Sequence, residues 1–264
     1  MWRKTAVLCL VFLSASVSAV LAQEVDIYDL KADFAADSAE LKFVKMIAET
    51  LTPEALTVIF ERPPESDGFI SDVYIAAEGV SANTPYRLAY LAIRGRIIRL
   101  TPPAGWDVAE LRSFKPEKWE GFFNLELILD EDDLRAGLDV FMKQNRETAD
   151  KWSGLFVDFR PGSIFVRGKY DVSSGMNAAF KITSGLELRQ GKQIWLVNTN
   201  IEINNAEQTD AICSEIRRIN PPVDFTEVEI PLVLKTLTIT DKEIRVMTAT
   251  RPEAFPGITY RYRR

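Results

Sequence analysis

Four consecutive acidic residues come closest to a catalytic or metal-binding motif in this 264-residue chain. They are Asp130, Glu131, Asp132 and Asp133. Paired carboxylates can hydrolyse glycosidic bonds, and clustered carboxylates can hold divalent cations. A calcium loop, however, needs alternating ligands, a central glycine and a later glutamate, and this run lacks them. Acidic side chains also stabilise the first turn of a helix, so we expect the run to begin a helix rather than to form a site.

Two further motifs fall short of a reactive site. Gly185 to Lys192 approaches a phosphate-binding loop, but five residues separate its glycines, whereas the motif has four, and Gln193 stands where serine or threonine would bind magnesium. We expect Gly191 and Lys192 to form a hairpin turn between two strands instead. Cys213 has no adjacent cation and base to activate its thiol, so we expect it to pack as a small hydrophobe.

The chain contains no histidine. This excludes Ser-His-Asp and Cys-His nucleophile arrangements, histidine-ligated zinc and the commonest general base. We therefore predict a protein that is not an enzyme, with no catalytic residue, no metal and no cofactor. A carboxylate-based envelope hydrolase is the alternative, because two acids can suffice for glycoside hydrolysis.

The N-terminus has the pattern of an export signal. Arg3 and Lys4 precede an apolar stretch, and small residues offer cleavage after Ala19 or Ala22. We predict a signal peptide at residues 1–22, one domain at residues 23–264, and a periplasmic or envelope location. Cleavage removes two of the 32 basic residues and none of the 38 acidic ones, which leaves a net charge of −8. Nucleic acid is therefore not an expected partner.

Three amphipathic helices are expected. The first follows a capping box formed by Asp37 and Glu40 and ends before Pro53. The second begins in the acidic run described above, and the third covers residues 208–219. These helices supply apolar stripes that a sheet can pack against.

Between the helices, apolar and polar residues alternate with the period of a strand. This holds for residues 125–129, 164–172 and 195–203, and residues 86–100 form another long strand-like run. One dry and one wet face are typical of an antiparallel sheet. The sequence predicts an α+β fold in which a long, curved antiparallel sheet wraps over amphipathic helices. Glycines inside the strands, at Gly95, Gly168 and Gly185, indicate bulges or bends.

The apolar strand faces are expected to line an elongated groove that holds an acyl chain. Burial of methylene groups, at about 0.8 kcal/mol each, would retain the chain without chemistry. Headgroups would stay at the wet rim, near Arg160, Arg167 and Lys169. The basic tail Tyr260–Arg264 is a second candidate contact, for an anionic membrane surface. The candidate groove residues are Leu125, Leu127, Val166, Phe180, Ile182, Trp195, Val197 and Ile201.

Four stretches of the chain follow one another in a familiar order. They are two paired strands around Gly79-Val80 (Phe69–Val80, then Tyr86–Ile93), a strand that enters an acidic helix start (Leu125–Leu134), a central meander (Phe159–Gly168, Ala178–Leu188 and Ile194–Ile203) and a closing strand pair (Val228–Thr248). Together they resemble the LmeA-like phospholipid-binding family of bacterial envelope proteins. Residues 99–123 have no counterpart in that pattern.

The resemblance implies a soluble envelope protein that binds phospholipid in an apolar cavity, for lipid transport or envelope maintenance. It implies contact with a membrane surface and offers no catalytic residue. A second alternative, besides the hydrolase, is a structural or partner-binding envelope module whose own side chains fill the groove.

Overall fold

The computed structural model describes residues 24–27, 38–65, 67–81, 87–99, 120–144, 152–173, 176–207, 220–221, 223–226 and 232–264. Three predictions lie outside these residues: the signal peptide at 1–22, the helix at 208–219, and the environment of Cys213.

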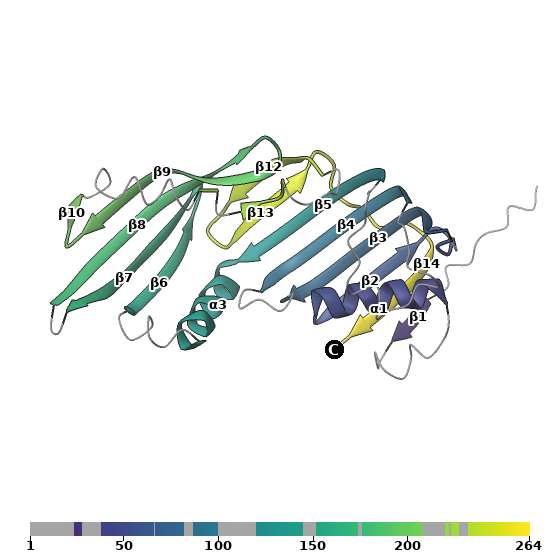
Figure 1. Cartoon of the computed structure of the whole chain (residues 1–264), viewed down its shortest axis with the longest axis horizontal. Coiled ribbons are helices and arrows are strands. Elements are labelled where there is room, and N and C mark those ends of the chain that lie inside the picture. The colour runs from purple at the N-terminus through teal and green to yellow at the C-terminus, as the bar shows by residue number, and fades with distance from the viewer. Residues whose placement is uncertain are drawn as a thin grey trace, which may run out of the picture.

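The first sheet has the strand order β1-β14-β2-β3-β4-β5-β13-β12. All neighbours pair antiparallel except β1 and β14, which are parallel. Figure 1 shows the long central strands lying side by side. The strands are β1 (Glu24–Ile27), β2 (Ala55–Phe60), β3 (Phe69–Val80), β4 (Leu88–Arg99), β5 (Glu120–Asp130), β12 (Leu234–Ile239), β13 (Glu243–Thr248) and β14 (Ile258–Arg263).

The second sheet is antiparallel and has the order β10-β9-β8-β7-β6, with β11 paired to β9. It fans out at the other end of the molecule (Figure 1). Its strands are β6 (Trp152–Arg160), β7 (Ser163–Ser173), β8 (Met176–Arg189), β9 (Gln193–Ile203), β10 (Ala206–Glu207) and β11 (Val223–Asp224). The antiparallel prediction is confirmed, but the chain builds two sheets rather than one long curved sheet.

The two helices within the described residues are α1 (Ala39–Leu51) and α3 (Glu131–Gln144), and both were predicted. The N-cap of α1 is Ser38 rather than Asp37, because the Ser38 hydroxyl accepts a hydrogen bond from the Leu41 N–H at 3.3 Å. Three acidic residues fill the first turn of α3, as expected from the helix dipole. The described part of the chain is mostly β, so α+β overstates its helical share.

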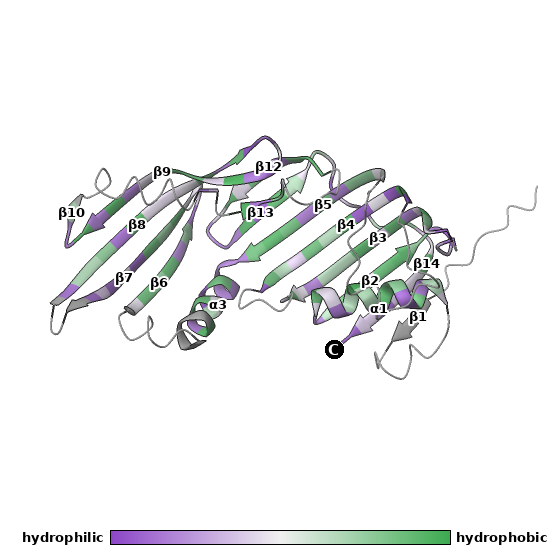
Figure 2. Cartoon of the chain, viewed as in Figure 1, coloured by the Kyte–Doolittle hydropathy of each residue, from purple (hydrophilic) through white to green (hydrophobic). Residues whose placement is uncertain are grey.

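The face of the first sheet that packs against α1, which we call the helix face, holds most of the core. Alternate residues point to it, as the row Phe60, Val73, Gly95 and Phe123 across four strands shows. Phe43, Val44 and Ala48 of α1 are buried against this face. Figure 2 shows α1 lying over these strands, with hydrophobic residues in both.

The second sheet also has two chemically distinct faces. Across it, Val157, Val166, Ile182 and Ile201 form one row, and we call that side the apolar face. The next row, Phe156, Arg167, Lys181 and Glu202, lies on the opposite side, the polar face. Val157 and Phe159 belong to the same core cluster as the helix face of the first sheet. The apolar surfaces of the two sheets therefore meet.

Side chains of α3 bind the backbone of β6, the edge strand of the second sheet. Arg135 Nε donates to the Val157 carbonyl at 2.7 Å, and Glu131 accepts a hydrogen bond from the Phe159 N–H. An uncovered edge strand is a template for aggregation. The acidic residue and the arginine of α3 thus satisfy this part of the edge.

The predicted alternation of β9 is wrong at one point. Trp195, Val197 and Ile201 were expected on one face because all have odd numbers. The pairing skips a residue on β9 between Val197 and Asn200, next to Gly185 of β8, so that Trp195 lies opposite Glu187 while Ile201 lies opposite Ile182. Asn198, at φ +49°, makes this bulge. Trp195 and Val197 consequently lie on the polar face, and Ile201 on the apolar face.

Candidate functional site

A cavity of about 210 Å³ lies between α1 and the helix face of the first sheet. Every side chain around it is apolar. The lining residues are Phe43, Met46 and Ile47 of α1, Val73, Ile75, Ile93, Gly95, Ile98, Phe123 and Leu125 of the sheet, and Leu232. A space of this kind has no polar atom to hold water, and dry apolar cavities bind nonpolar guests.

Local sequence periodicity explains how these residues converge. Phe43 and Ile47 are four residues apart, so they share one side of α1. Val73 and Ile75 alternate along β3, which brings both to the helix face. Gly95 allows the side chains of Ile98 and Phe123 to pack over the strand. A Cβ at this position would lie only 2.3 Å from Ile98 Cδ1 and 3.1 Å from Phe123 Cε1.

The apolar face of the second sheet extends the nonpolar surface beyond this cavity. Leu232 lines the cavity and belongs to the same buried cluster as Phe159 and Ile194 of the second sheet. Further along, the residues are only partly buried; they include Ile164, Val166, Phe180, Ile182, Leu186 and Leu188. A nonpolar ligand longer than the cavity therefore has a second surface to follow.

The predicted groove residues divide into three groups. Leu125 lines the cavity, and Leu127 lies two residues further along the same face of β5. Trp195 and Val197 are on the polar face of the second sheet, where the Arg189 guanidinium lies 4.5 Å from the Trp195 ring. The remaining candidates, Val166, Phe180, Ile182 and Ile201, lie on its apolar face.

The predicted headgroup residues all lie on the polar face of the second sheet, away from the cavity. Arg160 pairs with Asp158 at 3.0 Å and stacks 4.1 Å from the Phe165 ring. Arg167 and Lys169 line an open depression of about 290 Å³ together with Lys181. The structure therefore brings Arg167 and Lys169 together, but places neither at the rim of the apolar cavity.

The acidic run is divided among structural contacts. Asp133 accepts a hydrogen bond from Arg87 Nη1 at 2.6 Å, and Glu131 pairs with Arg135 at 2.6 Å. Asp132 is 94% exposed. Burial, and then the negative charge of Asp133, raise the pKa of Asp130 above its usual value. The run therefore leads into α3, as expected, with Glu131, Asp132 and Asp133 in the first turn of the helix.

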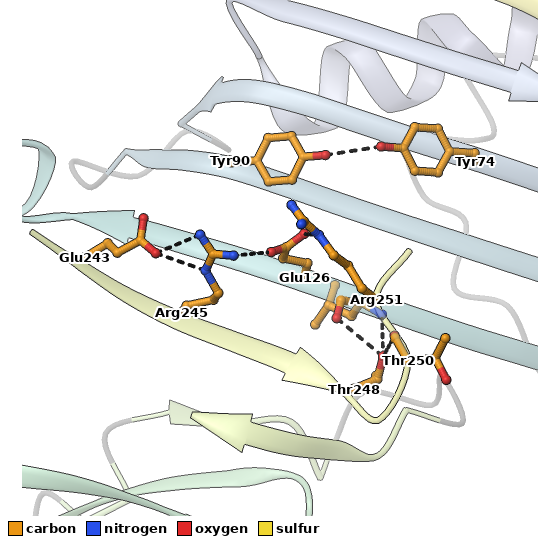
Figure 3. Close-up of polar contacts among 9 residues, drawn as sticks. Tyr74, Tyr90, Glu126, Glu243, Arg245, Thr248, Thr250 and Arg251 are labelled. Carbon is orange, nitrogen blue, oxygen red and sulfur yellow. Dashed lines mark hydrogen bonds and ion pairs between the residues drawn. The ribbon is translucent and has the colours of Figure 1, made fainter. Parts of the chain in front are cut away.

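A buried polar cluster lies on the outer face of the first sheet, opposite α1 (Figure 3). Glu126 has a side chain only 1% exposed and receives Arg245 Nη1 at 3.0 Å and Arg251 Nε at 2.7 Å. The Tyr74 and Tyr90 hydroxyls lie 3.1 Å apart beside it. Burial, the Tyr74 hydroxyl and the nearby Glu126 raise the pKa of Tyr90.

Sequence reasoning missed Glu126 because it stands at a polar position of an alternating strand. Alternation predicts correctly that Glu126 points away from the apolar face. It does not show that residues 249–257 cover the outer face, where Phe255 packs with Ile59, Tyr74 and Ala92. The signal available in the sequence was weak, namely the two arginines Arg245 and Arg251 close to the chain's last strand.

The basic tail is a strand rather than a free segment. β14 pairs with β2 along its whole length, and Tyr260 and Tyr262 face the core. Burial raises the pKa of Tyr260 to about 12. Arg261 and Arg263 point to the exposed side.

Comparisons with protein-family models, with curated proteins and with solved structures find no match to this chain. Among the helices in the described ranges, none has the length and apolar character needed to cross a membrane.

Proposed function

We propose that this chain binds an acyl lipid, a phospholipid in particular, with part of one acyl chain in the cavity beneath α1. The supporting observation is the wholly apolar lining of that cavity, which adjoins the partly exposed apolar face of the second sheet. Nonpolar surface left partly open in a folded chain indicates an interaction site.

The size of the cavity limits what it can hold. A cavity of about 150 Å³ lined by Leu, Ile and Phe accommodates one benzene molecule. The space beneath α1, about 210 Å³, therefore suits a few methylene groups rather than a whole lipid. At about 0.8 kcal/mol per methylene, a segment of this size binds modestly, so tight retention requires the rest of the acyl chain to lie along the apolar face of the second sheet.

The same proposal assigns the chain to the cell envelope as an exported, non-enzymatic lipid carrier or maintenance protein. It rests on the signal-like residues 1–22 and on the resemblance to the LmeA-like family. Two acids of the run, Glu131 and Asp133, are engaged with Arg135, the β6 backbone and Arg87, which favours binding over carboxylate catalysis.

A cavity-filling variant on α1 tests the site. Ile47→Trp extends into the cavity from its partly buried position, whereas Thr50→Trp places the same residue at an exposed position of the same helix. We expect native mass spectrometry and lipid extraction to find phospholipid on the wild type and on Thr50→Trp, and several-fold less on Ile47→Trp.

Thermal unfolding of all the purified proteins serves as the folding control. Lipid-free wild-type protein, or an Ile47→Trp variant that keeps its full lipid load, contradicts the proposal. A lipid-free wild type with a cooperative unfolding transition would instead support the structural or partner-binding module.

A further inference from the structure

Ile97 near the end of β4 has an unusual backbone conformation and an unusual exposure. Its φ is +56°, in the left-handed region, which is a genuine outlier for a β-branched residue. Its side chain is 57% exposed, whereas the next residue, Ile98, is 3% exposed and lines the cavity. The strained conformation therefore turns Ile98 inward and holds Ile97 outward, with no burial of Ile97 to offset the strain.

A second large apolar side chain lies beside it. Phe122 of β5 is 65% exposed, the highest value among the exposed large hydrophobic residues. Gly121, at φ +136°, brings β5 so close that a Cβ there would lie 2.8 Å from the Ile97 carbonyl oxygen. The bulge in the pairing between Arg96 and Arg99 thus sets Ile97 and Phe122 side by side at one end of the sheet.

The surroundings of this pair are apolar on one side and basic on the other. Ile98 and Phe123, which directly follow Ile97 and Phe122 in the sequence, line the cavity beneath α1. Arg96 and Arg99 are exposed, and Arg96 is the register partner of Phe122. Exposed aromatic and aliphatic side chains with flanking arginines suit the boundary between headgroups and acyl chains.

We propose that Ile97 and Phe122 form a membrane-docking tip that inserts into a lipid bilayer next to the cavity. This inference rests on the proposed lipid-binding function. A bilayer fits better than a protein surface because exposed arginines flank the pair, where anionic headgroups would lie. Phe122 lies on the outer face of the sheet and the cavity on the helix face, so an acyl chain leaving the bilayer would pass around this end of the sheet to reach Ile98 and Phe123.

The strain at Ile97 provides a test that separates docking from a purely structural role. Asparagine tolerates the left-handed region far better than isoleucine. Ile97→Asn therefore removes the apolar side chain and relieves the backbone at the same time. We expect its thermal midpoint to equal or exceed that of the wild type while its membrane binding falls.

The experiment is co-sedimentation of the full chain with vesicles of equal parts phosphatidylcholine and phosphatidylglycerol. We expect Ile97→Asn and Phe122→Ser each to lower the bound fraction about fivefold or more. Val140→Ser is the matched control: it removes another exposed apolar side chain, 40% exposed on α3, the helix that follows the opposite end of β5. It should bind vesicles as the wild type does.

The lipid that co-purifies with each protein is measured separately by native mass spectrometry. Retained lipid together with vesicle binding unaffected by either substitution overturns the docking tip and leaves lipid binding standing. Gel filtration covers the remaining alternative: a dimer that Phe122→Ser dissociates, without vesicle binding by the wild type, assigns the tip to a second copy of the chain and also overturns the inference.

Discussion

Arg251 Nε lies 2.7 Å from Oε2 of Glu126, although the two residues are 125 positions apart and the arginine is 59% exposed. This ion pair joins β5 to the segment that leads into the last strand. Arg94 holds the same segment: its guanidinium donates to the Glu253 carbonyl at 3.3 Å and lies 4.9 Å from the Phe255 ring. Residues 249–257 are thereby fixed across the outer face of the first sheet.

Substitutions in this cluster should differ in cost according to burial. Glu126→Gln removes the charge that both Arg245 and Arg251 bind, and should lower the free energy of unfolding by about 1.5–3 kcal/mol. Arg251→Ala should cost about 1 kcal/mol or less, since exposed ion pairs contribute little. Urea unfolding measures both values. Equal losses in the two variants would show that Glu126 draws no more stability from the cluster than Arg251 does.

Asp130 should make stability depend on pH in the direction opposite to most carboxylates. Because burial and Asp133 raise its folded-state pKa, the folded chain favours the protonated form. The stability that this provides is present below the unfolded pKa and is lost as pH rises through the raised folded pKa. Asp130→Asn should therefore raise the thermal midpoint at neutral pH, with the difference disappearing below pH of about 4.

Asparagine is also a good residue for a helix start, so Asp130→Asn keeps the capping capacity of the position before α3. Asp132→Asn, at a residue 94% exposed, is the matched control and should change stability by less than about 0.5 kcal/mol at either pH. A lower midpoint for Asp130→Asn at neutral pH would mean that the Asp130 carboxylate stabilises the fold.

Two isoleucines of β3 allow the cavity to be tested through stability. Ile70 is fully buried and does not line the cavity, whereas Ile75 does. Loss of an isoleucine side chain to alanine costs about 2–5 kcal/mol, and the cost grows with the void that is left. Ile70→Ala should fall near the upper end and Ile75→Ala near the lower end, because one side of Ile75 already faces empty space.

Urea unfolding of both variants gives these two costs. The thermal shift on adding a fatty acid then provides a second comparison. Ile70→Ala should keep the wild-type shift, while Ile75→Ala should show a smaller one because it removes contacts with the ligand. A larger cost for Ile75→Ala than for Ile70→Ala would indicate that the cavity is closed in solution.

Local patterns predicted single elements well and their assembly poorly. The spacing of apolar residues and the acidic first turn were enough to predict α1 and α3, and alternation predicted strands at β5, β7 and β9. Alternation tells which residues share a face, but not which strand is the neighbour. Alternation could therefore not predict the division into two sheets. Nor could it predict the hydrogen bond that joins them, from the Gly162 N–H to the Ile239 carbonyl at 3.0 Å.

The candidate site shows the same division. Leu125 was predicted correctly as a residue of the apolar helix face, but its partners around the cavity come from α1, β3 and β4. These residues are distant in sequence, and only the packing of α1 on the sheet brings them together. Arg160, Arg167 and Lys169 were placed beside the groove because strand parity does not show which side of a sheet faces a ligand.

The bulge at Asn198 is the clearest case in which one residue reverses a face, and it can be tested directly. Asn198 has φ +49° and an exposed side chain, a conformation that glycine and asparagine adopt readily and β-branched residues do not. Asn198→Gly should change the free energy of unfolding by less than about 0.5 kcal/mol. Asn198→Val should lower it by about 1–3 kcal/mol, since the side chain gains no burial to offset the strain.

Deleting Asn198 should be the most damaging change, because it restores simple alternation along β9. Trp195 and Val197 would then be forced against Phe180, Ile182 and Ile201 on the apolar face, or those residues would move into water. Urea unfolding of the three variants should rank them in this order; equal stability of the valine and glycine variants would show that β9 passes Asn198 without a left-handed residue, and that Trp195 shares a face with Ile201 after all.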